Sequence, residues 1–445
     1  MVHNAVAEDS LLEYIQKLAK PDTCTVGLVL GQPSSTKDYI IHFAKTPPCE
    51  EDSKSNIKLK EIKSINDVFD VWVADHAKHA TRMLPGGMYV LGIFVVSNED
   101  LLTPFSNKLK SILQEVHRQL SANSYMHGTS TKSEKLVLNY CTKTQSYSCK
   151  SYDVVNSSVK PAEIKFLSKP IGWRQFQCKY ELDRIYSIPI DKSDLTLRRH
   201  MNDIIEKTSD CLKPAIFAFD GEIRKNDAAL ESMDKKIGKS SGGNDHAGPT
   251  MVSIYLPCEI YKTTKPIDMS NCAGHIKLTG QIASNVWMHS KATVKDVCDA
   301  ILEDIIRSLA ARLDMHWDSL IEEEHGSPED TNSIHEPPRR VFIHLPHTEV
   351  TLSDYLFPGE GPQDAQISLQ ELLDITVDEK DGVTDIEGQA DLVDVYSNSI
   401  ESDDTEGSLK SIQTDANKLM YSLGIGIALL VLLISLVVHY FRFIP

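Results

Sequence analysis

The residues best placed to do chemistry are two histidines beside a carboxylate, His76 and His79 after Asp75. Spaced i, i+3, they could share one face of a helix and hold a metal ion. The usual zinc-binding helix, however, spaces its histidines i, i+4 and takes a third ligand from elsewhere in the chain. We therefore interpret both histidines as ordinary helix residues, on the surface or satisfied within the core.

A second motif, Gly238-Lys239-Ser240, ends like a phosphate-binding loop. That loop needs a glycine five residues earlier, where Met233 stands, with a strand before it and a helix after it. None of these conditions is met. The nine cysteines form no Cys-x-x-Cys pair, which favours reduced and mostly buried thiols. We expect no catalytic, cofactor-binding or metal-binding residue and no cofactor.

These residues lie among alternating helices and strands in residues 1–170. The helix that carries His76 is expected over 65–84 with Ser64 as its cap, and Leu84-Pro85-Gly86-Gly87 breaks it before the very apolar strand Met88–Val96. Apolar periodicity predicts further helices at 11–20 and 104–120, strands at 23–30 and 38–44, and a hairpin of 135–142 with 147–155. This order predicts an α+β fold whose first domain is an α/β sandwich.

Residues 171–353 repeat the same style and form the second predicted α/β region. Helices are expected at 195–212 and from 294 to about 313. Strands are expected at 176–190, 215–223, 250–261, 273–289 and 340–346. Long polar loops separate them.

The net charge of −17 is concentrated in one segment. Residues 354–406 hold sixteen carboxylates and a single basic residue, Lys380, so the rest of the chain is almost neutral. Such a segment buries too little apolar surface to offset its ordering entropy, which predicts a disordered linker over 354–415. Its mildly apolar part, Ile367–Val377, could form a short helix on a partner. No basic stripe is present, which argues against nucleic acid as a partner.

Residues 419–438 contain no charge and are long enough to cross a bilayer as a helix. We predict a single transmembrane tail anchor over 419–441 that contacts lipid, with the soluble domains facing the cytosol. A buried core helix is the first alternative, but core helices are shorter than this span. A signal for a lipid anchor is the second, but it requires an N-terminal signal peptide, and Met1–Ser10 is polar. The expected anchor face comprises Leu419, Leu423, Ile427, Val431, Ile434 and Val438.

Two segments, Gly27–Glu51 and Trp72–Ser97, resemble the signature of the Odr-four (odorant response abnormal) family. Residues 276–305 and 339–355 are similar as well, and the apolar span is in the family's position. The most specific positions are expected to be structural or partner-binding. They are Gly31, Ser34, Ser35, Lys37, Asp38, Tyr39, Arg82, Leu84, Pro85, Gly86 and Gly87.

The resemblance implies an endoplasmic-reticulum tail-anchored protein that supports folding or delivery of odorant-type G-protein-coupled receptors. It implies the Ufm-specific cysteine protease as a protein partner and receptors as clients. The family's first domain also resembles the MPN fold, in which a strand ending in His-x-His-Pro supplies two zinc ligands. If Val90–Ser97 is that strand, those positions fall near Val95 and Ser97, which cannot replace them.

Three interpretations remain open. The one we favour is an adaptor without enzymatic activity, which brings the modifier protease to the membrane. The second is a membrane-anchored hydrolase of ubiquitin-like conjugates, which requires titratable residues converging in a cleft. The third is a trafficking chaperone that packs on receptors through its own span, where Ser422 and Gly426 would allow close helix approach.

Overall fold

The computed structural model describes residues 2–48, 50–51, 58–59, 62–129, 132–232, 248–257, 271–322, 336–377 and 382–388. Residues 1–389 form one compact unit, and residues 390–445 lie outside the described residues. No helix within the described ranges is long and apolar enough to cross a membrane. The predicted anchor at 419–441, with Leu419, Leu423, Ile427, Val431, Ile434 and Val438, lies outside them.

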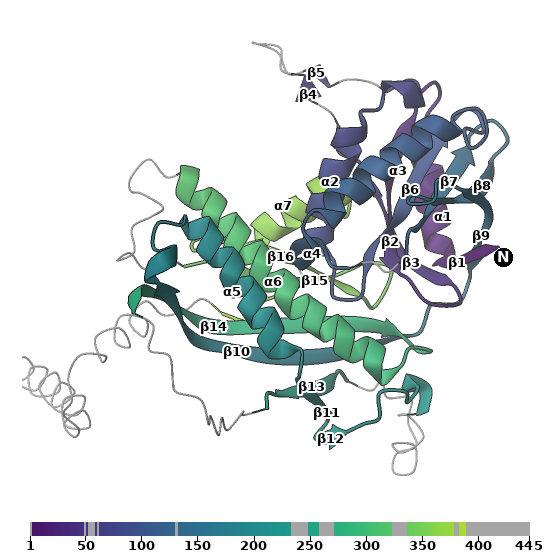
Figure 1. The fold of residues 1–445 in the computed structure, drawn as a ribbon. Coiled ribbons are helices and arrows are strands. Elements are labelled where there is room, and N and C mark those ends of the chain that lie inside the picture. The colour runs from purple at the N-terminus through teal and green to yellow at the C-terminus, as the bar shows by residue number, and fades with distance from the viewer. Residues whose placement is uncertain are drawn as a thin grey trace, which may run out of the picture. The chain divides into compact units, whose positions relative to one another are not determined.

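Seven strands of the N-terminal half close into a barrel in the order β1-β3-β2-β6-β7-β8-β9 (Figure 1). They are β1 (His3–Glu8), β2 (Thr25–Gln32), β3 (Asp38–Lys45), β6 (Tyr89–Ser97), β7 (Glu134–Cys141), β8 (Ser146–Asp153) and β9 (Val159–Leu167). Parallel pairing of β1 with β9 closes the ring. The expected mixture of helices and strands is therefore confirmed, but the first region is a closed barrel and not an open sandwich.

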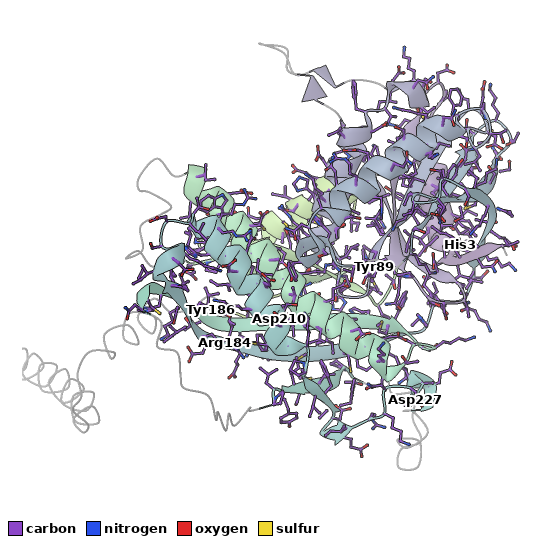
Figure 2. All side chains as sticks on the ribbon, viewed as in Figure 1. His3, Tyr89, Arg184, Tyr186, Asp210 and Asp227 are labelled. Carbon is purple, nitrogen blue, oxygen red and sulfur yellow. The ribbon has the colours of Figure 1, made fainter. Side chains whose placement is uncertain are left out.

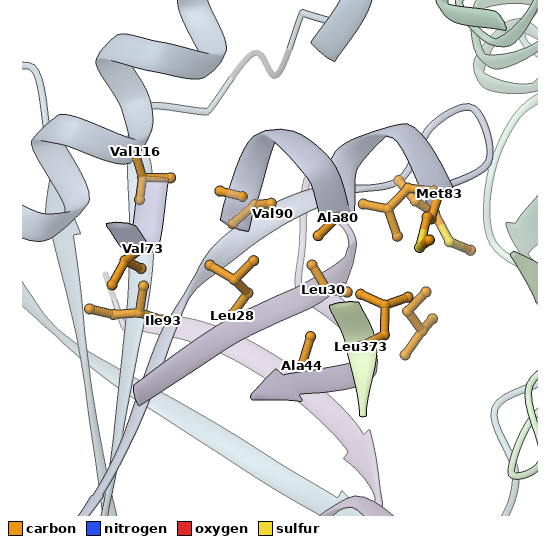
Figure 3. Packing of buried hydrophobic residues seen from close by; sticks show 14 of the residues in the cluster. Leu28, Leu30, Ala44, Val73, Ala80, Met83, Val90, Ile93, Val116 and Leu373 are labelled. Atoms are coloured by element: carbon orange, nitrogen blue, oxygen red, sulfur yellow. The ribbon is translucent and has the colours of Figure 1, made fainter. Parts of the chain in front are cut away.

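The central strands are apolar on both faces because both faces are buried. In β2, Val29 packs inside the barrel with Phe43 and Phe94. Leu28 and Leu30 point the other way, into the larger cluster under the helices. Figure 3 shows this cluster, in which Val73, Ala80 and Met83 of α2 lie over Leu28, Leu30 and Val90.

Helices α2 (Asp70–Met83) and α3 (Ser106–Ser121) pack together over one face of the barrel strands. Helix α1 (Asp9–Lys17) contacts β1, β3 and β9, and its buried residues belong to the same cluster as Val29. Ser64 does not cap α2 as predicted. It forms a capping box with Asp67 around a short 3-10 turn, Ile65–Asp67, and the chain is extended at Val68 before α2 begins. Because Ser64 caps this 3-10 turn, α2 begins at Asp70 and not directly after Ser64.

The second region is a five-stranded sheet in the order β12-β11-β13-β10-β14. The strands are β10 (Trp173–Pro189), β11 (Ile216–Phe219), β12 (Glu222–Ile223), β13 (Thr250–Tyr255) and β14 (Cys272–His289). β10 and β14 pair over their whole length as a long antiparallel ribbon. Helices α5 (Leu197–Leu212) and α6 (Val294–Glu322) lie over it (Figure 1), and their apolar faces form a second core with the ribbon.

The start of the segment predicted to be a disordered linker is folded, which corrects that prediction. β16 (Thr351–Leu356), α7 (Pro362–Leu373) and β17 (Val383–Thr384) follow β15 (Arg339–His344), and the three strands form a sheet in the order β16-β15-β17. Ala365, Leu369 and Leu373 of α7 are buried in the cluster that lies over the barrel. The prediction rested on the total charge of residues 354–406, and that total does not reveal the apolar face of α7. Residues 389–415 of the predicted linker lie outside the described residues.

Short elements complete the architecture. They are β4 (Glu50–Glu51), β5 (Lys58–Leu59), α4 (Ser124–His127) and the 3-10 turns Ile190–Lys192 and Leu230–Ser232. α4 contacts α2, α3 and α6.

Candidate partner-binding cleft

The signature turn between β2 and β3 is held by Asp38. Its buried carboxylate lies 2.8 Å from His3 Nε2 and 2.6 Å from Lys132 Nζ, and accepts a hydrogen bond of 3.3 Å from the backbone N–H of Ser34. Burial alone would raise the pKa of Asp38, but the hydrogen bonds from His3 and Lys132 outweigh it and hold the pKa below its usual value. The ionised carboxylate of Asp38 therefore holds the turn in place through these three contacts.

The same cluster contains a serine, a histidine and an aspartate. His3 Nδ1 lies 3.0 Å from Ser151 Oγ, while its Nε2 faces Asp38 (His3 is labelled in Figure 2). A hydrolytic triad uses these residue types, but its serine must meet a substrate. Ser151 is only 1% exposed and stands in the middle of β8. The arrangement joins three barrel strands, and no sequence motif predicts it because the three residues are far apart in the chain.

Other positions of this turn connect the barrel to β14. The Tyr39 ring stacks on His289, with 4.4 Å between ring centroids, and Lys37 Nζ lies 5.1 Å from the Tyr39 ring centroid. The Gln32 amide donates to the Trp287 carbonyl at 3.0 Å and accepts from the His289 N–H at 3.0 Å. The Gln32 side chain thus pairs with the backbone of β14 in the way that a neighbouring strand would. Gly31 lies at a bulge in β2, where an added Cβ would come within 2.0 Å of the Tyr39 carbonyl oxygen.

The second signature, Leu84-Pro85-Gly86-Gly87, turns the chain from α2 into β6. Gly87 has φ +76°, a conformation that residues with a Cβ rarely adopt. Gly86 lies so close to α6 that an added Cβ would be 2.1 Å from the Ala300 carbonyl oxygen. Leu84 is buried, and the Pro85 carbonyl accepts from the Met88 N–H at 3.2 Å. These residues therefore have structural roles.

The turn is fixed by the buried carboxylate of Asp304 on α6. It accepts from the Gly86 N–H at 2.9 Å and from Ser284 Oγ at 2.7 Å, and it forms two parallel bonds with Arg340 of β15, at 2.8 and 3.0 Å. Burial would lower the pKa of Arg340, but Asp304 outweighs burial and raises it. The remaining signature residue, Arg82, lies 3.2 Å from Asp314 of the same helix.

Between these two turns and α6 lies a cleft of about 910 Å³. The barrel contributes Ser34, Ser35, Gly87 and Lys132 to its wall, and the second region contributes His289, Lys291, Asp296 and Asp299. Burial lowers the pKa of His289 to about 4, so the ring is neutral, and its Nδ1 has no hydrogen-bond partner. The wall of the cleft thus carries hydroxyls and charges of both signs, while the unpaired His289 nitrogen is buried behind it.

The sequence comparisons identify the family. A family model described as ODR4-like, Odorant response abnormal 4-like, matches residues 27–384. The chain belongs to the ODR4-like family. It is 28% identical to the human protein odr-4 homolog over 388 residues, covering 84% of each chain. It is 23% identical to the odorant response abnormal protein 4 of Caenorhabditis elegans over 349 residues, covering 77% of this chain and 71% of that protein.

Among solved structures, UfSP from C. elegans matches with a TM-score of 0.46 and 9% sequence identity. The match covers 86% of this chain and 58% of that one.

In this ODR4-like protein, only one histidine of the pair, His76, is buried, and its hydrogen bonds give it a structural role. His76 lies 3.2 Å from Thr46 Oγ1 and 2.6 Å from the Leu372 carbonyl oxygen, and burial lowers its pKa to about 4. His79 is exposed. No group of three or more potential metal ligands occurs among the described residues, and Gly238-Lys239-Ser240 lies outside them.

The end of β6 shows what stands at the positions compared with MPN enzymes. Val95 is buried, and Ser97 Oγ donates to the Glu99 carbonyl at 2.6 Å. Absence of zinc and of enzymatic activity remains a prediction for this ODR4-like chain.

Proposed function

We propose that this chain is an adaptor without enzymatic activity, anchored in the endoplasmic-reticulum membrane by residues 419–441. It brings the Ufm-specific cysteine protease to that membrane and supports folding or delivery of odorant-type G-protein-coupled receptors. Membership of the ODR4-like family supports the receptor role in general terms. The protease partner, the membrane and the MPN kinship of the barrel come from the sequence resemblance.

One observation carries the adaptor proposal. The family-signature residues hold a turn, a bulge and a helix contact in place around a large cleft. Residues used in this way shape a binding surface, whereas catalytic residues would leave reactive groups pointing at a substrate. We expect the cleft, with Ser35 and Lys291 exposed on its wall, to bind the protein partner.

Affinity purification with three forms of the chain tests the proposal. The full chain should retain the protease, and so should a chain ending at Ser411, because the binding surface lies in residues 1–389. Ser35→Trp, which fills the cleft, should weaken capture by at least about tenfold, or about 1.4 kcal/mol. Val155→Trp is the matched control, since Val155 is 65% exposed and outside the cleft.

Protease turnover on membrane-bound conjugates separates recruitment from activation. Tethering raises effective concentration without a new contact at the active site. The chain ending at Ser411 should therefore leave turnover on soluble conjugates unchanged and reduce it on membrane-bound ones. If Ser35→Trp leaves capture of the protease unchanged, the protease binds outside the cleft. Cleavage by the isolated chain that Ser151→Ala abolishes would instead support the hydrolase.

A further inference from the structure

The last described residues, Gly382–Gly388, are held to the fold mainly by one carboxylate. We call this segment the strap. Glu387 accepts hydrogen bonds of 2.8 Å from the backbone N–H groups of both Ala283 and Arg340, and pairs with the Arg312 guanidinium. Its side chain is 4% exposed. Charge-assisted bonds of this kind are about twice as strong as neutral ones.

The rest of the strap makes few contacts. β17 pairs with β15 only at Val383–Ile343 and Thr384–Phe342. Asp385 forms a partly exposed pair with Arg339, 2.9 Å apart. Thr384 and Asp385 are exposed, and the apolar contact of the strap is that of the partly buried Val383 with the cluster over the barrel. Beyond the three contacts of Glu387, the attachment of the strap therefore rests on two paired residues, one partly exposed ion pair and the packing of Val383.

The pocket around Glu387 is built by groups that the strap does not position. Ser308 Oγ accepts from Arg312 Nε and Nη2 at 3.2 and 3.1 Å, and the Tyr355 ring lies 5.8 Å from that guanidinium. The Arg340 side chain is fixed by Asp304, which holds its backbone N–H in place. Ala283 belongs to β14, whose other edge is paired with β10.

Without the strap, this pocket would leave a buried cation and two N–H groups unsatisfied, which is costly. Another carboxylate is the group that would restore all three contacts. The strap itself shows what fits: two residues paired antiparallel with β15, followed by a bend that places a carboxylate three residues after the last paired residue.

We propose that the strap covers an exchangeable strand-addition groove along β15, and that an extended acidic segment of a partner protein binds there in its place. Main-chain pairing with β15 supplies part of the affinity, as in other cases of strand addition. The Glu387 pocket supplies the specificity. This groove is separate from the cleft and does not depend on which partner the cleft binds.

A peptide-exchange measurement on the full chain tests this proposal. The probe is a fluorescein-labelled heptapeptide with the strap sequence, Gly-Val-Thr-Asp-Ile-Glu-Gly, followed by anisotropy. It should bind the Glu387→Ala chain at least about tenfold more tightly than the wild-type chain, whose groove is occupied. The same peptide with glutamine in place of glutamate should bind at least about tenfold more weakly. Glu371→Ala, an exposed acid of α7, is the matched control and should resemble wild type.

Failure of the heptapeptide to bind a folded Glu387→Ala chain, or equal binding of the glutamine peptide, would overturn the proposal. Hydrogen exchange on the wild-type chain gives a second measurement that needs no variant. The amides of Val383 and Thr384 should exchange faster than those of Ile343 and Leu352, and excess heptapeptide should speed their exchange further. If the strap amides exchange their hydrogens only when the whole unit unfolds, the strap does not detach by itself and the proposal is wrong.

Discussion

At the scale of residues, the signature turn Leu84–Gly87 and the carboxylate of Asp304 depend on each other. Gly86 must lack a Cβ to let its N–H reach Asp304, and Gly87 must take a positive φ to turn toward β6. Asp304 is buried with Arg340, so its charge is balanced only while both partners and the turn are in place. The two glycines thus determine how closely α6 approaches the barrel.

Replacing Gly87 by valine tests this dependence. A β-branched residue at φ +76° is strained, and its Cβ would lie 3.1 Å from Ala300 Cβ. We expect Gly87→Val to lower the free energy of unfolding by about 1–3 kcal/mol, measured by denaturant unfolding of residues 1–389. Gly172→Val is the control, because an added Cβ there meets nothing within 4 Å. Equal midpoints for Gly87→Val and wild type would show that the turn tolerates a side chain.

The sequence predicted this turn but not its partners. A Leu-Pro-Gly-Gly stretch between a helix and an apolar strand indicates a turn with a glycine at positive φ from local chemistry alone. Its contact with Asp304 spans more than two hundred residues, and no local pattern identifies it. The same holds for His3, Asp38 and Ser151, whose association depends on barrel closure.

At the scale of elements, two buried histidines fix α7, one to barrel strand β3 and one to helix α2. His42 Nε2 donates to the Leu373 carbonyl at 2.8 Å, and His76 Nε2 lies 2.6 Å from the Leu372 carbonyl oxygen. Burial lowers the pKa of each to about 4. A folded pKa below the unfolded value of 6.5 means that the stability contribution is complete above pH 6.5 and is lost as pH falls through about 4.

We therefore expect residues 1–389 to lose stability between pH 6.5 and pH 4. His127 and His289 are lowered to about 4 as well and act in the same direction. Asp354 opposes them, because burial raises its pKa to about 6 and its contribution is lost as pH rises through that value. Each histidine contributes on the order of 1–3 kcal/mol over this window.

Thermal melts of wild type and the His42→Gln/His76→Gln double variant across this range measure the effect. The double variant should be less stable at pH 7.5 and should lose less between pH 6.5 and pH 4. Parallel curves for the two proteins would exclude these histidines as the titrating groups.

Truncation tests whether the C-terminal elements belong to the core. A chain ending at Val350 loses β16 and α7, and with them the buried residues Leu352 and Leu369. We expect residues 1–389 to melt cooperatively and residues 1–350 to expose apolar surface and aggregate, as seen by size-exclusion chromatography and near-ultraviolet circular dichroism. Cooperative melting of both chains at the same temperature would show that these elements are dispensable.

Element prediction succeeded where periodicity was strong, as in β2, β6, α5 and α6. β9 was not predicted because its sequence alternates weakly and contains Pro161. In the structure Pro161 lies where β9 changes partner from β8 to β1, a place where a missing N–H is tolerated. β1 was missed because its apolar residues pack only once the barrel closes.

At the scale of the whole molecule, the folded unit ends near residue 389 and the proposed anchor begins at residue 419. The strap is therefore the last part of residues 1–389 that the structure describes. Net charge could not predict this boundary, since the acidic residues continue from β16 through the strap and beyond. The boundary depends on a few buried apolar side chains and on Glu387 among many solvated carboxylates.

Two charges in the proposed anchor test the membrane attachment on which the adaptor function depends. Ile427→Arg with Val431→Arg places two guanidinium groups near the bilayer centre, at about 2.5–3.5 kcal/mol each on insertion scales. We expect the double variant to move from the membrane pellet to the supernatant in alkaline carbonate. Ser408→Arg with Ser411→Arg adds the same charge before the span and should still pellet. A double anchor variant that still pellets would mean that residues outside the span hold the protein on membranes. A soluble variant that still captures the protease would separate partner binding, in residues 1–389, from membrane delivery.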